Sequence, residues 1–362
     1  MNKKLKIYVY AISKNEEKFV DRWVDSMNEA DGIFVLDTGS TDNTIELLRS
    51  YPNVVVKQEI IKPWRFDTAR NKSLDMVPED VDVCVCTDID ERFNPGWREE
   101  LEKVWTTDTT RGNYMYNWSL NEDGTPGVSF ILNKIHSRKG HRWVHAVHEV
   151  ITCDIEEKEV YIPITLTHYQ DRTKSRAMYL DILEQAVKDN PNDSRDMYCL
   201  GREYKAHYRY DDAIKCFHDY LKLEGATWDQ ERSATMRYIA DCYKSKGFIE
   251  EAIMWYQMAI RETPNVREPR YELGALYHDI EDYEQARHHL NIALKLEKNK
   301  DYINEETSWN GSIYDLLAIS EYNTGHYKEA YENAKIAANI FKTDERIQEN
   351  CKLMEEVYNE NK

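Results

Sequence analysis

Residues 5–170 alternate short apolar runs with segments whose apolar residues recur every three or four positions. The apolar runs are rich in Val, Ile and Tyr, are bounded by turn-forming or charged residues, and occupy 7–13, 32–40, 53–61 and 81–90. The segments between them have helical spacing behind good N-cap candidates and occupy 15–30, 40–51 and 67–77. Strand and helix in alternation predict an α/β domain built around a largely parallel sheet.

Two later runs predict a different kind of strand pairing. Residues 112–120 and 128–136 are strand-like, and the sequence Asn-Glu-Asp-Gly-Thr-Pro-Gly between them is a strong turn signal. We therefore expect an antiparallel hairpin that is added to the parallel sheet.

Acidic residues stand where the predicted strands end. Asp37 lies at the end of the second run, and Asp88 and Asp90 lie at the end of the fourth. Ligands of open α/β sheets collect at the carboxyl ends of the strands. Position alone therefore marks these three carboxylates as candidate site residues.

Beyond Arg172 the strand signal fades and a longer repeat begins. Each unit has a small residue late in a first helix and an Ala twelve positions later, and the small residues are Gly201, Ala240, Gly274 and Ala318. Their separations of 39, 34 and 44 indicate a period of 34 with insertions after the first and third units, which we expect to be interhelix loops. This is the tetratricopeptide pattern, which predicts a stacked superhelix with a concave face. The alternative is an unrelated amphipathic helical bundle.

Two domains are expected, because 362 residues exceed the usual size of one. The α/β domain would occupy residues 1–172, and the all-α array would occupy residues 173–362. Segment 175–191 has the pattern of a joining or capping helix that ends at Asn190-Pro191.

Charge and cysteine content exclude some classes of partner and location. A net charge of −18 argues against a nucleic-acid ligand, which needs clustered Lys and Arg. The seven cysteines are an odd number without the spacing of a disulfide framework, which favours a reducing compartment. No run approaches about 18 uninterrupted apolar residues, so we expect a soluble cytoplasmic protein that is not embedded in a membrane.

The stretch Val-Cys-Val-Cys-Thr-Asp-Ile-Asp-Glu-Arg-Phe (83–93) invites three interpretations: a thiolate metal site, an aspartyl-phosphate site, or a carboxylate pair that holds a divalent cation. A thiolate zinc site needs two more Cys or His ligands nearby, which this stretch lacks. An aspartyl-phosphate enzyme usually has Thr or Val four residues after its nucleophile, whereas Arg92 stands four after Asp88. The carboxylate pair is favoured, and Cys84 and Cys86 are expected as apolar fillers of a buried strand.

Taken together, these features resemble the glycosyltransferase family 2 enzymes of the GT-A fold, especially bacterial members with a C-terminal tetratricopeptide array. The matching segments are 11–17, 37–44, 69–71 and 88–90, which appear in the expected order. The resemblance implies a Rossmann-like, nucleotide-sugar-binding GT-A domain followed by the helical array. It also implies an inverting enzyme whose donor is most often a uridine diphosphate (UDP) sugar, carrying a hexose or N-acetylhexosamine.

The resemblance assigns residues to the donor and to a metal ion. The donor-binding set would be Ser13, Asp37, Asp67, Arg70 and Asp88. Asp88 and Asp90 would hold Mn²⁺ or Mg²⁺ against the diphosphate, with His168 as an additional ligand, and the cation would neutralise the departing group. Less specific interpretations stay open: an N-cap role for Asp37 and Asp67, and a structural histidine at the domain joint for His168. Glu91 would be either a third polar neighbour of the cation or a solvated loop residue.

The segment 140–150 contains three histidines, which also fits a metal site. In similar family members, a Val-His-Glu stretch like Val147-His148-Glu149 borders the acceptor site. Inverting transfer needs a general base to take a proton from the incoming nucleophile. Glu149 is the leading candidate for that base, with His148 and His145 as alternatives.

The expected function is metal-dependent transfer of a sugar to a Ser, Thr or Cys of a peptide or protein bound in the tetratricopeptide groove. The chain is similar in architecture to enzymes that glycosylate bacteriocin precursors. The array would equally suit a glycan-synthesis partner or a homodimer, and the acceptor could be a glycan. A non-catalytic adaptor with a degenerate transferase domain is the alternative from another class, although retention of the acidic residues and Arg70 together argues against it.

Overall fold

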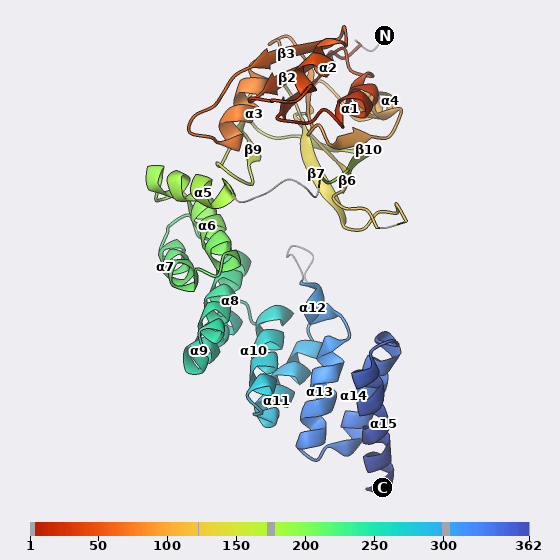
Figure 1. Ribbon diagram of the computed structural model, residues 1–362, viewed down its shortest axis with the longest axis vertical. Helices are drawn as coiled ribbons and strands as arrows, with labels where there is room; N and C mark the ends of the chain where they lie inside the picture. Colours follow the sequence, from red (N-terminus) through yellow and green to blue (C-terminus); the bar gives the residue numbers. More distant parts are fainter. Residues whose placement is uncertain (1–3, 122, 172–177, 299–304, 362) are drawn as a thin grey trace. The chain divides into compact units, whose positions relative to one another are not determined.

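The computed structural model describes residues 4–121, 123–171, 178–298 and 305–361 (Figure 1). The chain divides into two compact units, Met1–Asp189 and Asn190–Lys362. The boundary predicted between residues 172 and 173 lies outside the described residues. Helix α5 (Met178–Asp189), which was expected to join or cap the array, falls within the first unit.

The first unit contains an eight-stranded sheet with the order β3-β2-β1-β4-β7-β6-β10-β5. Strands β1 to β4 run parallel to one another, and each lies within a predicted apolar run. Strand β7 is antiparallel to both β4 and β6, so the predicted hairpin is confirmed. The strands are β1 (Ile7–Ser13), β2 (Gly32–Asp37), β3 (Val54–Gln58), β4 (Val83–Cys86), β5 (Glu91–Phe93), β6 (Arg111–Asn117), β7 (Ser129–His136) and β10 (Glu159–His168). A separate two-stranded ribbon consists of β8 (His141–Val144) and β9 (Val150–Cys153).

Both faces of the central strands are buried. Trp23 and Trp97 cover one face from α1 (Val20–Met27) and α4 (Trp97–Val104), and α2 (Thr44–Arg49) follows β2. The other face packs against α3 (Phe66–Leu74) and Trp143 of the β8–β9 ribbon. Side chains alternate along β4, so Cys84 and Cys86 lie on the second face in an apolar cluster. Both are fully buried, which confirms them as fillers of the strand, and burial raises the pKa of Cys84 to about 12 and that of Cys86 to about 11.

The second unit is a series of helical hairpins that matches the predicted repeat. Each hairpin has a three-residue turn, at 207–209, 246–248, 280–282 and 324–326. The hairpins are α6 (Ser194–Ala206) with α7 (Tyr210–Tyr220), α8 (Asp229–Ser245) with α9 (Ile249–Glu262), α10 (Arg267–Asp279) with α11 (Tyr283–Leu294), and α13 (Ser312–Asn323) with α14 (Tyr327–Ile340). Helix α15 (Glu345–Glu360) packs on the last of them. The unit is therefore an all-α array of tetratricopeptide type.

Small residues allow the paired helices to approach closely. A Cβ built on Gly201 would lie 2.4 Å from a ring atom of Phe217, and one on Gly274 would lie 2.7 Å from Leu290 Cγ. The first predicted insertion is the loop 221–228 between α7 and α8. The second includes the short helix α12 (Glu306–Trp309), and its residues 299–304 lie outside the described part of the chain.

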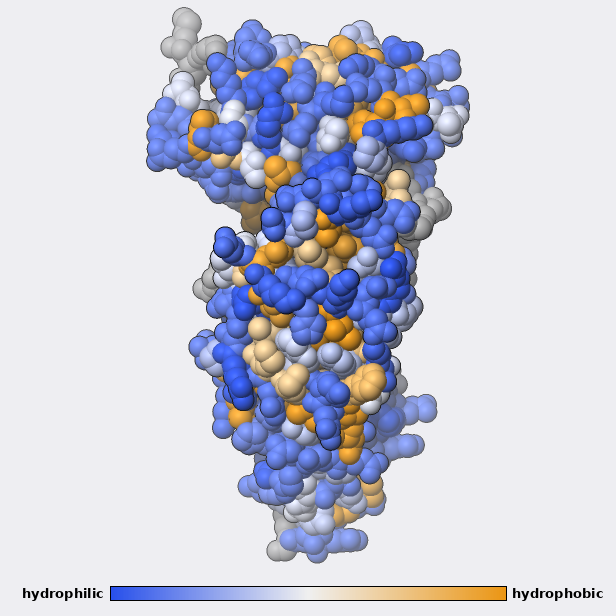
Figure 2. Space-filling model, turned by 90° about the vertical axis from the view of Figure 1, so that its left-hand side faces the viewer, coloured by the Kyte–Doolittle hydropathy of each residue, from blue (hydrophilic) through white to orange (hydrophobic). Residues whose placement is uncertain are grey.

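On the face of the molecule that Figure 2 shows, hydrophilic side chains predominate and hydrophobic ones form separate patches. Within the described ranges, no helix combines the length and apolar character that crossing a bilayer requires.

Candidate active site

The parallel strands bring the predicted acidic residues to one edge of the sheet. Strand β1 lies between β2 and β4, and Ser13 at its end is in register with Asp37 at the end of β2. Asp88 and Asp90 follow β4 directly. The sheet thus places all three carboxylates beside the carboxyl ends of adjacent strands.

Asp37 is fully buried and organises the turn after β2. Its carboxylate accepts hydrogen bonds from five donors: Ser13 Oγ (2.9 Å), Ser40 Oγ (2.5 Å), the amides of Gly39 (3.0 Å) and Ser40 (2.9 Å), and Gln58 Nε2 (3.2 Å). Gly39 has φ +113°, a conformation that favours glycine. Asp37 is not an N-cap, because α2 begins only at Thr44.

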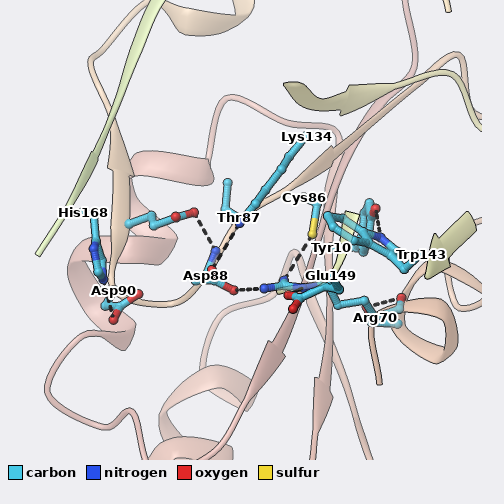
Figure 3. Close-up of polar contacts among 12 residues, drawn as sticks. Tyr10, Arg70, Cys86, Thr87, Asp88, Asp90, Lys134, Trp143, Glu149 and His168 are labelled. Atoms are coloured by element: carbon cyan, nitrogen blue, oxygen red, sulfur yellow. Dashed lines mark hydrogen bonds and ion pairs between the residues drawn. The ribbon is translucent and has the colours of Figure 1, made fainter. Parts of the chain in front are cut away.

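Arg70 is the central cation of the site (Figure 3). It projects from α3, is 4% exposed, and donates from Nη2 to Asp88 Oδ1 at 2.8 Å and from Nε to Glu149 Oε1 at 2.5 Å. Burial disfavours its charge, but Asp88 and Glu149 outweigh this effect and raise the pKa of Arg70 well above its usual value. One guanidinium therefore connects Asp88, which was predicted to bind the sugar donor, with Glu149, which was predicted to be the base.

Asn71 holds the ribbon that leads to Glu149. Its side-chain amide donates to the carbonyl of Trp143 at 2.8 Å and accepts the Trp143 amide at 2.9 Å. The Trp143 ring lies 5.0 Å from the Arg70 guanidinium, and its Nε1 donates to Tyr10 Oη at 2.8 Å. Asn71 lies inside α3 and pairs with strand β8 of the neighbouring ribbon.

Lys134 is a site residue that the sequence did not reveal. It lies on β7, and its Nζ is 3.4 Å from Asp88 Oδ2. Burial opposes the charge on Lys134, but Asp88 and Glu91 outweigh burial and raise the pKa of Lys134. The one available signal was a lysine within a strand-like run. Its place beside Asp88 depends on β7 pairing with β4, which the sequence did not predict.

Asp90 and His168 form a second polar pair at the same edge. Asp90 Oδ2 lies 3.2 Å from His168 Nε2, and His168 Nδ1 lies 3.2 Å from the carbonyl oxygen of Trp118. Burial lowers the pKa of His168, but the hydrogen bond and charge of Asp90 outweigh burial, so the net shift is upward. His168 thus pairs with Asp90, a residue of the first unit that lies close to the end of β4.

Glu91 is buried and holds the loop after β4 in place. It is 1% exposed, accepts the Asp88 amide at 2.8 Å, and accepts Tyr116 Oη at 2.8 Å. Burial raises the pKa of Glu91, and the charge of Asp88 adds to the shift. Its position inside the fold excludes the solvated-loop interpretation.

The loop between β8 and β9 carries the predicted acceptor-side residues. His145 and His148 both have positive φ, of 75° and 55°. The exposed ring of His148 is edge-on to Tyr179 of α5, with 5.9 Å between ring centroids. The three histidines of segment 140–150 do not form one metal-ligand cluster among the residues that the structure describes.

Asp67 is the second residue of α3 rather than its N-cap, which is Arg65. Its carboxylate pairs with the Arg65 guanidinium through two hydrogen bonds of 3.0 and 2.7 Å. The preceding aromatic residues, Trp64 and Phe66, meet edge to face at 5.2 Å. This segment thus lies at the start of the helix that carries Arg70.

Comparison with known proteins is consistent with this geometry. The model of glycosyl transferase family 2 matches residues 8–146, which include nearly all of β1, strands β2 to β4, Arg70, Asp88 and Asp90. The first unit contains a glycosyltransferase family 2 domain. The lipopolysaccharide core biosynthesis glycosyltransferase LpsC of Rhizobium meliloti (strain 1021) is 30% identical over 102 residues, which are 28% of this chain and 37% of that relative. The chain thus matches little more than a third of its relative's length.

Solved structures of helical-repeat proteins are similar to the chain only at a low level. MamA is 16% identical with a TM-score of 0.37, covering 46% of this chain and 83% of that one. YrrB, described as a TPR protein with an unusual peptide-binding site, is 16% identical with a TM-score of 0.40, covering 50% and 84%. The repeat assignment therefore depends on the helix pairs and their small residues.

Proposed function

We propose that the protein transfers a sugar, with inversion, from a UDP-sugar to a hydroxyl or thiol acceptor. The observation that carries this proposal is the Arg70 bridge between Asp88 and Glu149. It links Asp88, which follows strand β4 where the donor nucleotide would bind, to Glu149, the carboxylate expected on the acceptor side. A donor and an acceptor that reach these two groups would meet beside one buried cation.

The donor nucleotide would bind along the ends of β1, β2 and β4. Ser13 and Asp37 would face the base or ribose, and Asp67, Arg70 and Asp88 would complete the donor set. Among the contacts of Asp37, the one to Gln58 Nε2 at 3.2 Å is the longest. We expect a base N–H or ribose hydroxyl to replace that contact, because a carboxylate oxygen accepts either donor.

A divalent cation fits best at Asp90 and His168. Their oxygen and nitrogen atoms lie 3.2 Å apart, and each side chain retains some exposure, 14% for Asp90 and 18% for His168. Asp88 already pairs with Arg70 and Lys134, so we assign it to the donor side of the site. Carboxylate oxygen suits Mg²⁺ and Mn²⁺, and the imidazole favours Mn²⁺. When bound, the cation would neutralise charge on the diphosphate.

Arg70 and Lys134 supply fixed positive charge from the protein itself. Arg70 is buried and Lys134 is half-buried, both lie beside Asp88, and both have raised pKa values. A buried cation stabilises negative charge that develops on a leaving group more strongly than a solvated one does. Lys134 would therefore favour departure of the nucleoside diphosphate.

Glu149 is the better-supported base. The acceptor oxygen or sulfur forms its bond to the anomeric carbon, its proton passes to Glu149, and the sugar–phosphate bond breaks with its electron pair on the nucleoside diphosphate. Arg70 occupies Glu149 Oε1 and so orients the carboxylate. His148 is less suited, because its ring contacts Tyr179.

The acceptor would be a peptide or protein with a Ser, Thr or Cys side chain, bound by the helical array. The name of LpsC favours a second candidate, a lipopolysaccharide core glycan. The same array could also mediate homodimerisation. The alternative from another class is a non-catalytic adaptor, in which the buried Arg70 network would serve only the stability of the fold.

Hydrolysis of a panel of nucleotide sugars tests the proposal directly. We expect release of nucleoside diphosphate from at least one UDP-sugar, in a reaction that chelation of divalent cations suppresses. If the folded protein hydrolysed none of these donors in the presence of Mn²⁺, the proposal would be contradicted.

A further inference from the structure

Three potential metal ligands meet where the β8–β9 ribbon approaches the main sheet. His141 begins β8, Cys153 ends β9, and Glu157 precedes β10. One ligand atom from each lies within 4.8 Å of the others. These residues are separate from the Asp90–His168 pair in sequence and in chemistry.

The imidazole of His141 is arranged as a ligand. Its side chain is fully buried, and its Nδ1 lies 3.0 Å from the Lys139 carbonyl oxygen, which makes Nδ1 the protonated nitrogen. Nε2 then carries the lone pair. This atom is buried without a hydrogen-bond partner in the described part of the chain, and Glu157 Oε1 lies 3.7 Å away.

We propose that His141, Cys153 and Glu157 bind a borderline-soft divalent cation of the zinc class. In a tetrahedral site with zinc–nitrogen and zinc–oxygen distances of about 2.1 Å, those ligand atoms lie about 3.4 Å apart. The present separation of 3.7 Å between His141 Nε2 and Glu157 Oε1 needs only a small contraction. Cys153 Sγ lies 4.0 Å from Nδ1, the protonated nitrogen of the ring, so the Cys153 side chain would have to turn toward Nε2 to join the site. A water molecule would complete the four ligands.

Arg111 orients the carboxylate of this site. Its Nε donates to Glu157 Oε1 at 2.5 Å, and its Nη2 donates to the carbonyl oxygen of Ile151 on β9 at 3.1 Å. Such outer hydrogen bonds commonly fix the ligands of a metal. The ion would fasten β8 and β9 to the start of β10 and so steady the ribbon whose loop carries Glu149.

Cobalt titration of the full chain tests this site. Co²⁺ replaces Zn²⁺, and a thiolate ligand gives a charge-transfer band that oxygen and nitrogen ligands do not. We expect one equivalent of Co²⁺ to produce this band, Zn²⁺ to abolish it, and Cys153→Ser to lose it. Cys351→Ser is the matched control, because Cys351 is also partly buried but lies on α15. It should keep the band.

Glu157→Gln provides a second test if Cys153→Ser folds poorly, as judged by circular dichroism. It should keep the band but weaken Co²⁺ binding at least tenfold. Asp90→Asn should leave the band unchanged, so that failure here is distinguishable from failure of the proposed transferase. Any of three results would overturn the proposal. The folded wild type could lack the band, the band could persist in Cys153→Ser, or Glu157→Gln could bind Co²⁺ as tightly as the wild type.

Discussion

Arg70 and Glu149 lie 79 positions apart in the sequence, yet Arg70 Nε donates to Glu149 Oε1 at 2.5 Å. The contact joins helix α3 to the loop of the β8–β9 ribbon. Asp88 occupies another edge of the same guanidinium. Arg70 therefore couples the position of the proposed base to the loop that follows β4.

Glu149→Gln should abolish most transfer while leaving the nucleotide site intact. Loss of a general base typically costs about 10²–10⁴-fold in kcat. The glutamine oxygen can still accept from Arg70, so the dissociation constant for UDP should change little. Steady-state transfer and calorimetric titration measure the two effects. His148→Gln is the control, and its kcat should stay within about threefold of wild type. If His148→Gln lost most of its kcat and Glu149→Gln did not, the base would be assigned to His148.

Arg70→Met should destabilise the first unit. It leaves Asp88 and Glu149 without their shared cation, and breaking a buried ion pair from one side costs about 3–5 kcal/mol. The free energy of unfolding from urea denaturation measures this loss. Arg142→Met is the matched control on an exposed position of β8, and it should change stability by less than about 0.5 kcal/mol. Equal stability of the two variants would show that the Arg70 bridge contributes nothing to the fold.

Lys134→Met should lower kcat for donor hydrolysis more than it raises KM. In the proposed mechanism its charge acts on the leaving group, so its effect would belong to the transition state. We expect a loss of roughly 10²-fold, comparable to removal of one preorganised charge-stabilising group. Lys134→Arg keeps the charge and should recover part of the rate. If the methionine variant retained full kcat, Lys134 would be assigned to holding Asp88 alone.

The strand ends could be predicted from the sequence, but their neighbours could not. Asp37, Asp88 and Asp90 follow apolar runs, and parallel strands bring such ends together whatever the strand order. Lys134 and Asn71 act through contacts that depend on β7 pairing with β4 and on the ribbon packing against α3. Alternation and helical spacing carry no information about those contacts.

The repeat in the second unit was more predictable, because its packing is local. Gly201 and Phe217 belong to one hairpin, so their spacing in the sequence already implied contact. The ion pairs between repeats were not predicted. Arg237 of α8 binds Glu272 of α10 at 2.6 and 2.7 Å and Glu305 at 2.5 Å, and none of these three residues is part of the small-residue pattern.

Glu272 should make the stability of the helical array depend on pH. Burial raises its pKa to about 7, with Arg237 opposing the shift and Asp241 adding to it. Because the pKa of Glu272 is higher in the folded state than in the unfolded chain, protonated Glu272 stabilises the folded state. This contribution to the free energy of unfolding is complete below the ordinary pKa of 4.5 and is lost as pH rises through about 7. Relative to Glu272→Gln, the wild type should therefore lose stability across roughly pH 5 to pH 8.

Urea denaturation at a series of pH values measures this difference. Glu284→Gln, on α11 with a side chain that is 62% exposed, is the control and should follow the wild-type curve. Parallel curves for wild type and Glu272→Gln would contradict the raised pKa.

The central claim is that the first unit binds a nucleotide sugar with the help of a divalent cation. Calorimetric titration of UDP into wild type and Asp90→Asn, each with and without Mn²⁺, tests it most directly. We predict that Mn²⁺ strengthens UDP binding to the wild type at least tenfold and that Asp90→Asn loses this enhancement while it still binds UDP weakly. Absence of UDP binding to the folded wild type, with or without Mn²⁺, would contradict the account and favour the non-catalytic adaptor.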